Sequence, residues 1–197
     1  MKRSSLIILA VAAVLVACHE EVYNTADRRM FKAFDGIMGQ LCRIIIEECN
    51  KSESLDIEGT YLFRGDSLCI SKLSDTEFKL KTEDGAESAL DLTAELTGNI
   101  IWEYDNEEVN TFVVNGEGSC RISADSTLIY KISGLGIDLY HDVDYNRQDY
   151  TYFIYGSRGE IELTLSSSKE KQTYHYSNSG GRIRCRETGK LIRSYDD

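Results

Sequence analysis

Apolar residues near the start of the chain recur every three or four positions, which is the period of one face of a helix. The stripe consists of Met30, Phe34, Ile37, Leu41 and Ile45, widened by Phe31, Met38 and Cys42. We therefore expect an amphipathic helix over residues 25–50, ended by the polar run after Asn50. Gly36 and Gly39 lie inside it, where each costs up to about 1 kcal/mol. This cost predicts the close approach of another backbone.

After Leu55 the apolar residues alternate with polar ones, as in strands that have one buried face. Turn residues divide this region into short expected strands at residues 59–64, 68–73, 76–82, 88–97, 99–105, 109–114, 118–123, 127–132, 136–141, 149–155, 159–166, 171–176, 182–186 and 190–194. No βαβ alternation is present, so a parallel sheet is not expected. Short strands at this spacing are typical of an antiparallel sandwich or barrel.

Two segments of the strand region resemble each other. EGTYLFRGDSLCISKLS (residues 58–74) aligns without a gap with EGSCRISADSTLIYKIS (residues 117–133), and seven of the 17 positions are identical. Average composition would give about one identity. We therefore expect two tandem repeats of about 59 residues, at 58–115 and 117–176, followed by a C-terminal hairpin at 182–194.

The expected fold is mainly β (α+β), with the N-terminal amphipathic helix packed on an antiparallel β-sandwich or barrel built from the two repeats. Residues 25–197 would form a single domain, since a chain of this length can bury a sizeable core without a metal or a partner. We expect the apolar stripe of the helix to pack against Tyr61, Phe63, Ile70, Ile122 and Ile129.

The first residues have a different character. Two basic residues are followed by an apolar run from Leu6 to Val16. The end of this run leads into Cys18 through the segment Leu15-Val16-Ala17-Cys18. This run is too short to cross a bilayer, which needs roughly 20 apolar residues. The segment resembles the type II signal peptide, or lipobox, of bacterial lipoproteins. The resemblance implies removal of residues 1–17, lipid attachment at Cys18, and a lipidated tether at residues 18–24.

The residues after Cys18 bear on the location. His19 stands where the inner-membrane retention signal of enteric bacteria has Asp, and Glu20 and Glu21 resemble part of the surface-export signal of Bacteroidetes lipoproteins. These resemblances imply an outer-membrane protein that faces the periplasm or the cell surface. Its first partner would be the membrane, because each buried acyl methylene contributes about 0.8 kcal/mol.

Charge argues against one class of partner. Without residues 1–17 the chain has 20 basic and 33 acidic residues, a net charge of −13. Such a charge repels phosphate polymers, so no nucleic-acid partner is expected. Basic residues nevertheless gather near the C-terminus, where Arg182-Ile183-Arg184-Cys185-Arg186 alternates as in a charge-protected edge strand. Contact with an acidic partner or with anionic lipid is the functional alternative.

Five cysteines remain after lipidation: Cys42, Cys49, Cys69, Cys120 and Cys185. Cys42 and Cys49 would lie about 10.5 Å apart along the helix, too far for a disulfide between them. The sequence leaves the other pairings, and the fully reduced state, open.

Metal chemistry has little support. The three histidines, at positions 19, 141 and 175, lie far apart without ligand spacing, so neither a zinc site nor a cofactor is expected. The segment Asp142-Val-Asp144-Tyr-Asn146 has the alternate oxygens of a calcium loop. Arg147 and Phe153, however, stand where such a loop needs glycine and glutamate.

Gly65-Asp66-Ser67-Leu68 matches the tetrapeptide of GDSL hydrolases, and residues 138–141 supply an Asp-x-x-His. In that family the serine ends a parallel strand and opens a helix, whereas we expect a hairpin turn here, and Asp-Ser recurs at 125–126. We therefore expect no catalytic site. Both Asp-Ser sites also resemble the O-glycosylation acceptor pattern of Bacteroidetes exported proteins, which would make Ser67 and Ser126 candidate acceptors.

Tyrosines crowd the second repeat, at positions 140, 145, 150, 152, 155, 174 and 176. Tyrosine is a common strand residue, but rings beside carboxylates also suit a sugar or a protein. We therefore expect a non-enzymatic module that binds a glycan or an envelope protein through Tyr140, Tyr145, Tyr150 and Tyr152. The alternatives are a carbohydrate-active hydrolase that uses Asp142, Asp144 or Asp149, and a structural or inhibitory envelope protein.

Overall fold

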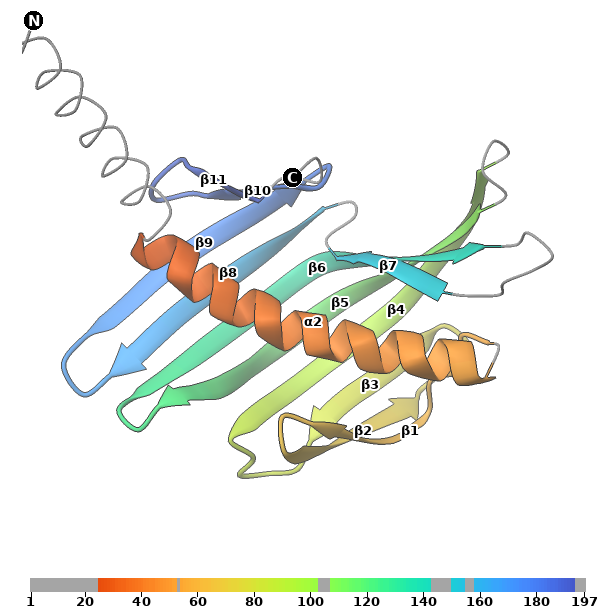
Figure 1. Cartoon of the computed structure of the whole chain (residues 1–197), viewed down its shortest axis with the longest axis horizontal. Helices are drawn as coiled ribbons and strands as arrows, with labels where there is room; N and C mark the ends of the chain where they lie inside the picture. Colours follow the sequence, from red (N-terminus) through yellow and green to blue (C-terminus); the bar gives the residue numbers. More distant parts are fainter. Residues whose placement is uncertain (1–24, 53, 103–106, 143–149, 155–157, 194–197) are drawn as a thin grey trace, which may run out of the picture.

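The computed structural model describes residues 25–52, 54–102, 107–142, 150–154 and 158–193. For residues 98–102, 107–108, 141–142 and 150–154 the description is of the backbone alone. One helix, α2 (Ala26–Ser52), crosses one face of a single antiparallel sheet (Figure 1). The mainly β fold with one N-terminal helix is therefore confirmed.

Helix α2 buries the predicted apolar stripe against the sheet. Its first turn is closed by the backbone amide of Arg29, which donates to the carbonyl of Thr25 at 3.0 Å. Phe34 is fully buried and meets the ring of Tyr130 edge-on, with ring centroids 5.5 Å apart. The ring of Phe31 lies 5.2 Å from that of Tyr176. These aromatic contacts fix where the helix lies on the sheet.

The strands follow one another through the sheet as a meander. They are β1 (Gly59–Phe63), β2 (Asp66–Lys72), β3 (Glu77–Thr82), β4 (Ser88–Trp102), β5 (Glu107–Ser123), β6 (Ser126–Asp142), β7 (Tyr150–Ile154), β8 (Arg158–Ser167), β9 (Lys171–Ser179), β10 (Arg182–Cys185) and β11 (Leu191–Arg193). Ten strands form a continuous path from β1 to β11, and β7 pairs with β6 off this path. Each strand of the path thus pairs with the next one along it.

The expected sandwich or barrel is not confirmed. Within the described residues there is one open sheet, with β1 and β11 at its two edges and no second sheet facing it. The physical reason is that α2 supplies the second layer. Twenty-seven helical residues span about 40 Å, and the nine steps between ten paired strands span about 43 Å. The helix is therefore long enough to cover the width of the sheet.

Several short strands expected from the sequence are joined into long ones. Strand β4 continues through a register shift between Thr97 and Asn99, and β5 continues through another between Val114 and Gly116. Turns were expected at these points because glycine often marks a turn. Glycine also marks β-bulges, which bend a strand without ending it. The turn expected at 97–99 is thus a bulge within β4.

A bulge in β6 exchanges the two faces of that strand. The buried residues before it are Leu128, Tyr130 and Ile132, and those after it are Leu135, Ile137 and Leu139. Gly134 takes a φ of 63° at this point, and its amide donates to Asn115 Oδ1 at 2.8 Å. A left-handed residue is tolerated here because glycine has no Cβ. The extra residue keeps both halves of β6 in contact with the core.

The repeat is not confirmed at the predicted register. Gly59 pairs with Ile70 in the first hairpin, whereas Gly118 pairs with Tyr130 in the second, one position further along. A shift of one residue moves every side chain to the other face of a strand. Ile129 is accordingly 39% exposed and lies on the face away from α2, although Ile70 is buried.

The packing partners expected for the helix are therefore right only in part. Phe63 and Ile70 are buried in the core, and Tyr61 packs against it. Ile122, by contrast, is 48% exposed. The expectation for Ile122 and Ile129 was wrong because of the one-residue shift in the second hairpin.

Gly36 and Gly39 do not mark a close backbone contact. A Cβ added at either position would meet no atom within 4 Å. Since both lie inside a helix, their cost in helix propensity is not balanced by packing at these positions. The expectation of a closely approaching backbone was therefore wrong.

Gly36→Ala should raise the free energy of unfolding by about 1 kcal/mol, because alanine is the better helix former and the site is open. Denaturant unfolding followed by circular dichroism measures this. Gly116→Ala is the matched control and should lower the free energy of unfolding. Its Cβ would lie 2.3 Å from the carbonyl oxygen of Asp91, and the residue has a φ of 134°. A destabilised Gly36→Ala protein would contradict the expectation.

Candidate functional site

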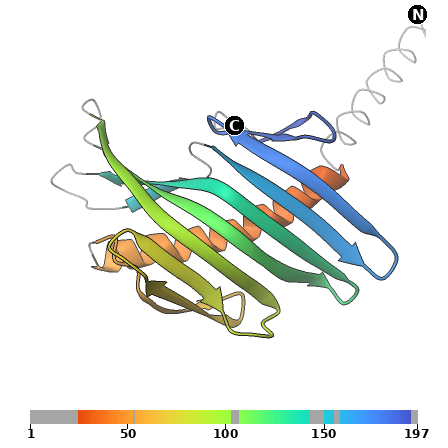
Figure 2. The same ribbon diagram turned by 180° about the vertical axis from the view of Figure 1, so that it is seen from behind.

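The face of the sheet opposite α2, called the open face here, is covered by no other described element. Figure 2 shows this face with the helix behind the strands. One face packed and one face in solvent is common for antiparallel sheets. The open face is therefore the broadest surface that the described part of the chain offers to a partner.

One row of directly paired residues crosses the open face. In strand order from β2 to β9 this charged row contains Cys69, Lys81, Asp91, Glu117, Lys131, Glu162 and His175, and it ends at Arg186, just after β10, whose backbone amide donates to the carbonyl of His175. Residues paired across antiparallel strands have Cβ atoms about 5 Å apart. Seven of these eight residues are charged or can become charged, so their order produces a defined pattern of charge across the sheet.

Two shallow depressions lie along the charged row and share Glu117. The larger encloses about 670 Å³ and is lined by Glu117, Lys131, Glu162, His175 and Arg186, among others. The smaller, of about 450 Å³, lies over Lys81, Asp91, Glu117 and Ile129. Both are open to solvent, and we call the two depressions together the trough.

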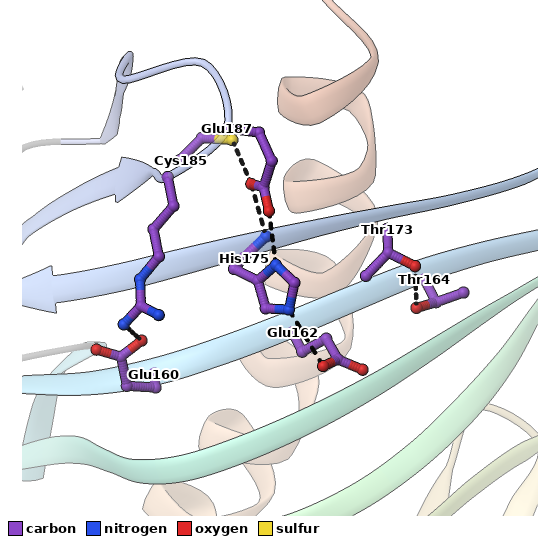
Figure 3. Close-up of polar contacts among 8 residues, drawn as sticks. Glu160, Glu162, Thr164, Thr173, His175, Cys185 and Glu187 are labelled. Carbon is purple, nitrogen blue, oxygen red and sulfur yellow. Dashed lines mark hydrogen bonds and ion pairs between the residues drawn. The ribbon is translucent and has the colours of Figure 1, made fainter.

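His175 lies between two carboxylates (Figure 3). Its Nδ1 is 2.6 Å from Glu187 Oε1, and its Nε2 is 3.2 Å from Glu162 Oε2. The backbone amide of His175 also donates to Glu187 Oε2 at 2.9 Å. The hydrogen bond to Glu187 and the charges of both carboxylates raise the pKa of His175, although partial burial opposes the shift.

The pKa of Glu187 moves in the opposite direction. Partial burial alone would raise it, but hydrogen bonds from the side chain and the backbone of His175 lower it to about 2. The contact thus favours the protonated form of the His175 imidazole and the ionised form of the Glu187 carboxylate. Because each ring nitrogen faces a carboxylate, His175 presents no free basic nitrogen to a substrate.

Charged residues toward the ends of the row form ion pairs, whereas those at its centre do not form them within the described residues. Arg186 pairs with Glu160, and Lys79 pairs with Asp91. Lys131 and Glu117 are exposed, and within the described residues neither has an ion-pair partner. The centre of the trough therefore holds one cation and one anion that can pair with another molecule.

The five cysteines after position 18 are free thiols. Cys42, Cys49, Cys120 and Cys185 are buried, and only Cys69 among the five is exposed. Burial, with a smaller contribution from a neighbouring carboxylate, raises the pKa of both Cys42 and Cys49 to about 12. A buried thiol with so high a pKa is a poor nucleophile. All four buried cysteines pack in the hydrophobic core.

The tyrosines expected to bind a ligand do not form one described cluster. Tyr140, half-buried on β6, pairs with Thr151, whereas Tyr150 and Tyr152 of β7 pair with His141 and Leu139. Tyr145 lies outside the described residues. The aromatic site therefore remains a prediction.

Tyr176 was counted among the same tyrosines, and its role is clear. Its side chain is fully buried against Phe31, and its hydroxyl donates to the backbone carbonyl of Asp27 at 2.7 Å. Tyr130 is likewise buried, with its hydroxyl donating to the carbonyl of Ala89 at 3.3 Å. Both rings pack in the core and are unavailable to a ligand.

The candidate modification sites lie next to turns. Ser67 and Ser126 are half-buried near the starts of β2 and β6, each after a two-residue turn. The first turn is tied down by Asp66, which accepts a hydrogen bond from the backbone amide of Ser88 at 3.0 Å. Cys18, Asp144 and Asp149 lie outside the described residues, and only the backbone of Asp142 is described.

The charged row was missed by the sequence analysis. Each of its residues occupies a polar position of an alternating strand, and such positions are usually solvated singly. The pairing of neighbouring strands brings these residues into one row, and the register of that pairing depends on the bulges in β4, β5 and β6. The only signal in the sequence was the density of charge at the polar positions.

Within the described ranges of the chain, no group of three or more His, Cys, Asp or Glu side chains is arranged to hold a metal ion. Nor does any helix in these ranges have both the length and the apolar character needed to cross a bilayer.

We expect the Glu187→Gln substitution to lower the pKa of His175 toward its ordinary value of about 6.5, as measured by NMR titration of the imidazole. In the native protein, protonated His175 stabilises the fold below pH of about 6.5, and this stability is lost as pH rises through its raised pKa. The contribution of Glu187 is present above about pH 4.5 and is lost as pH falls toward 2. An unchanged His175 pKa in the variant would count against the contact.

Thiol labelling should separate one cysteine from the other four. In the Cys18→Ser protein we expect a maleimide to modify Cys69 rapidly under native conditions, and all five thiols after unfolding. Mass spectrometry counts the adducts. The Cys69→Ser/Cys18→Ser protein should show no rapid labelling, whereas rapid modification of a second thiol would contradict the burial described above.

Comparison with protein-family models, with curated proteins and with solved structures gives no match for this chain. Its function is therefore inferred from the geometry of its own residues.

Proposed function

We propose that this chain is a lipid-anchored lipoprotein of a bacterial outer membrane, cleaved before Cys18, whose folded part is a non-enzymatic binding module. The N-terminal sequence supports the anchor, and the uncovered open face supports the binding role. The domain would face the periplasm or the cell surface and would present the charged row to an envelope protein.

The size of the open face fits a protein partner. A sheet about 43 Å wide, whose path strands average about nine residues or 30 Å, presents roughly 1,300 Å² on one face. A partner in a protein complex of standard size contributes about 800 Å². The open face is therefore large enough for a specific interface.

The shape and the chemistry of the trough favour a protein over a small sugar. Small-molecule sites typically bury most of the surface of their ligand, whereas this trough is open to solvent and carries the charged side chains of Lys131, Glu162 and Arg186 in its lining. Opposite charges in a fixed order also give specificity, because a partner with the wrong order would place like charges together. A glycan that binds through the tyrosines of residues 140–152 is the remaining alternative.

The arrangement around His175 supports a non-enzymatic role. A general base needs a free nitrogen within hydrogen-bond reach of its substrate, but Glu162 and Glu187 occupy both nitrogens. The carboxylates of Glu117, Glu160 and Glu162 also lie on a broad face and line its shallow depression. The hydrolase alternative would have to use Asp142, Asp144 or Asp149.

We also propose that the sheet arose from two tandem copies of one sequence segment. Hairpins β1–β2 and β5–β6 arise from the two similar sequence segments, and each turns over two residues. A later shift of one residue in the second hairpin would account for the different faces of Ile70 and Ile129.

The anchor is tested by metabolic labelling. The chain expressed in a Gram-negative host should incorporate labelled palmitate and float with outer-membrane vesicles, because two or more acyl chains hold a protein on a bilayer. Cys18→Ser should abolish incorporation, while Cys69→Ser should leave it unchanged. A mature polypeptide that still begins at the initiator methionine would refute the anchor.

Binding through the open face is tested by site-specific photo-crosslinking in intact cells. A crosslinker in place of Lys131, at the centre of the charged row, should give a protein adduct of defined mass. The same crosslinker in place of Arg43, exposed on α2, should not. Glu117→Lys should reduce the Lys131 adduct, whereas equal adducts from both positions, or adducts unaffected by Glu117→Lys, would contradict the proposed interface.

A further inference from the structure

The start of α2 is joined to the last hairpin of the sheet. Thr188 Oγ1 donates to Asp27 Oδ2 at 2.8 Å, and Arg28 Nη2 donates to the carbonyl of Leu191 at 2.8 Å. About two turns further along the helix, Asp35 pairs with Arg193 at 2.7 Å. These contacts, together with the Tyr176 hydroxyl on the carbonyl of Asp27, form what we call the clasp.

Asp27 is the centre of the clasp. Its side chain is 1% exposed, and a buried carboxylate is stable only when hydrogen bonds satisfy it. Burial alone would raise the pKa of Asp27, but hydrogen bonds that include those from Thr188 and the Arg28 amide lower it. The helix start is therefore fixed against β9, β10 and β11, as Figure 1 shows.

The clasp limits where the folded domain can lie relative to the anchor. Thr25 is only seven residues after the lipidated Cys18, with residues 19–24 between them. Seven residues span at most about 25 Å when fully extended. The edge that contains β10, β11 and the helix start must therefore stay within that distance of the lipid surface.

Charge divides the sheet between its two edges. The segment Arg182–Arg193, which contains β10 and β11, has five basic residues and one acidic residue, a net charge of +4. The segment Gly59–Trp102, which contains β1 to β4, has four basic and eight acidic residues, a net charge of −4. The basic edge is the one next to the tether.

Several cations at this edge are available for contact with another surface. Arg182 and Arg184 on β10, and Arg29 and Lys32 on the first turns of α2, are exposed and have no ion-pair partner within the described residues. Arg182 and Arg184 lie on the open-face side of the edge, and the two helical residues lie on the other side. Cations therefore flank both sides of the edge next to the tether.

We propose that this basic edge docks on the anionic headgroups of the membrane that carries the anchor, so that the sheet stands with β10 and β11 against the lipid and β1 to β3 away from it. The inference rests on the proposed lipid anchor and adds an orientation to it. The partner of the basic edge is the lipid surface itself, not a second protein.

The width of the sheet and the screening of charge by salt explain why the domain would adopt one orientation on the membrane. The seven strand steps from β2 to β10 span about 34 Å, and the Debye length at physiological salt is about 8 Å. In the proposed orientation the acidic half lies beyond the range of the anionic surface. Each cation near such a surface favours the contact by roughly fivefold, whereas the opposite orientation would place the acidic strands against it.

The orientation is tested with the lipidated full chain in vesicles that carry a headgroup-attached quencher. One protein has a fluorophore on Cys69 of β2, and the other has it on Ser179→Cys, next to β10, in a Cys69→Ser background. With 30% anionic lipid we expect strong quenching of the label at 179 and weak quenching of the label at Cys69. Equal quenching, or stronger quenching at Cys69, would overturn the proposal.

Charge variants separate docking from tethering alone. Arg182→Gln/Arg184→Gln should reduce the difference between the two labels, by up to roughly 25-fold in the orientation equilibrium. Lys81→Gln/Lys131→Gln removes the same charge from β3 and β6, away from the basic edge, and should leave the difference unchanged. Equal effects of the two double variants would show a general charge effect and would refute docking through the basic edge.

Flotation in the same samples reports on the anchor separately. Protein that fails to float with the vesicles lacks the lipid, which refutes the proposed function and with it this orientation. Protein that floats but shows no difference between the labels keeps the anchor and refutes the orientation alone.

Discussion

The whole structure depends on one helix burying one face of a wide sheet. An open antiparallel sheet of ten paired strands has two faces, and the described chain has only α2 to cover either of them. Because the helix is about 40 Å long and crosses the strands, it can cover nearly the full width of one face. The apolar stripe from Met30 to Cys49 faces the sheet as a consequence, and the charged row is left on the other face.

This arrangement explains why the charged row is continuous. Each strand keeps most of its apolar positions toward α2, so most of its charged positions face the solvent. The bulge at Gly134 in β6 keeps the apolar residues on both sides of it directed toward the core. Lys131 therefore lies in register with Glu117 on one side and Glu162 on the other. The charge pattern of the open face and the packing of the core are set by the same register.

The sequence was sufficient for features that depend on local periodicity. The helix stripe around Phe34 and the alternation of strands such as β3 and β8 follow from neighbouring residues alone. The long strands β4, β5 and β6 were divided wrongly because a glycine at a bulge and a glycine at a turn look alike locally. The position of His175 opposite Glu162 was not predictable, since it depends on pairing between strands. Tyr176 was grouped with exposed tyrosines because composition does not tell which face a strand residue occupies.

The clasp also has a consequence for how the chain folds. The path strands pair in sequence order, so the sheet can grow by adding each strand to the previous one as the chain is made. The helix is synthesised before all of them, yet Arg28 reaches Leu191, 163 residues later. Its apolar stripe therefore stays without its full partner until the final hairpin arrives. The native state is completed by the joining of the first and last elements, which makes an intact C-terminal segment a condition for a closed core.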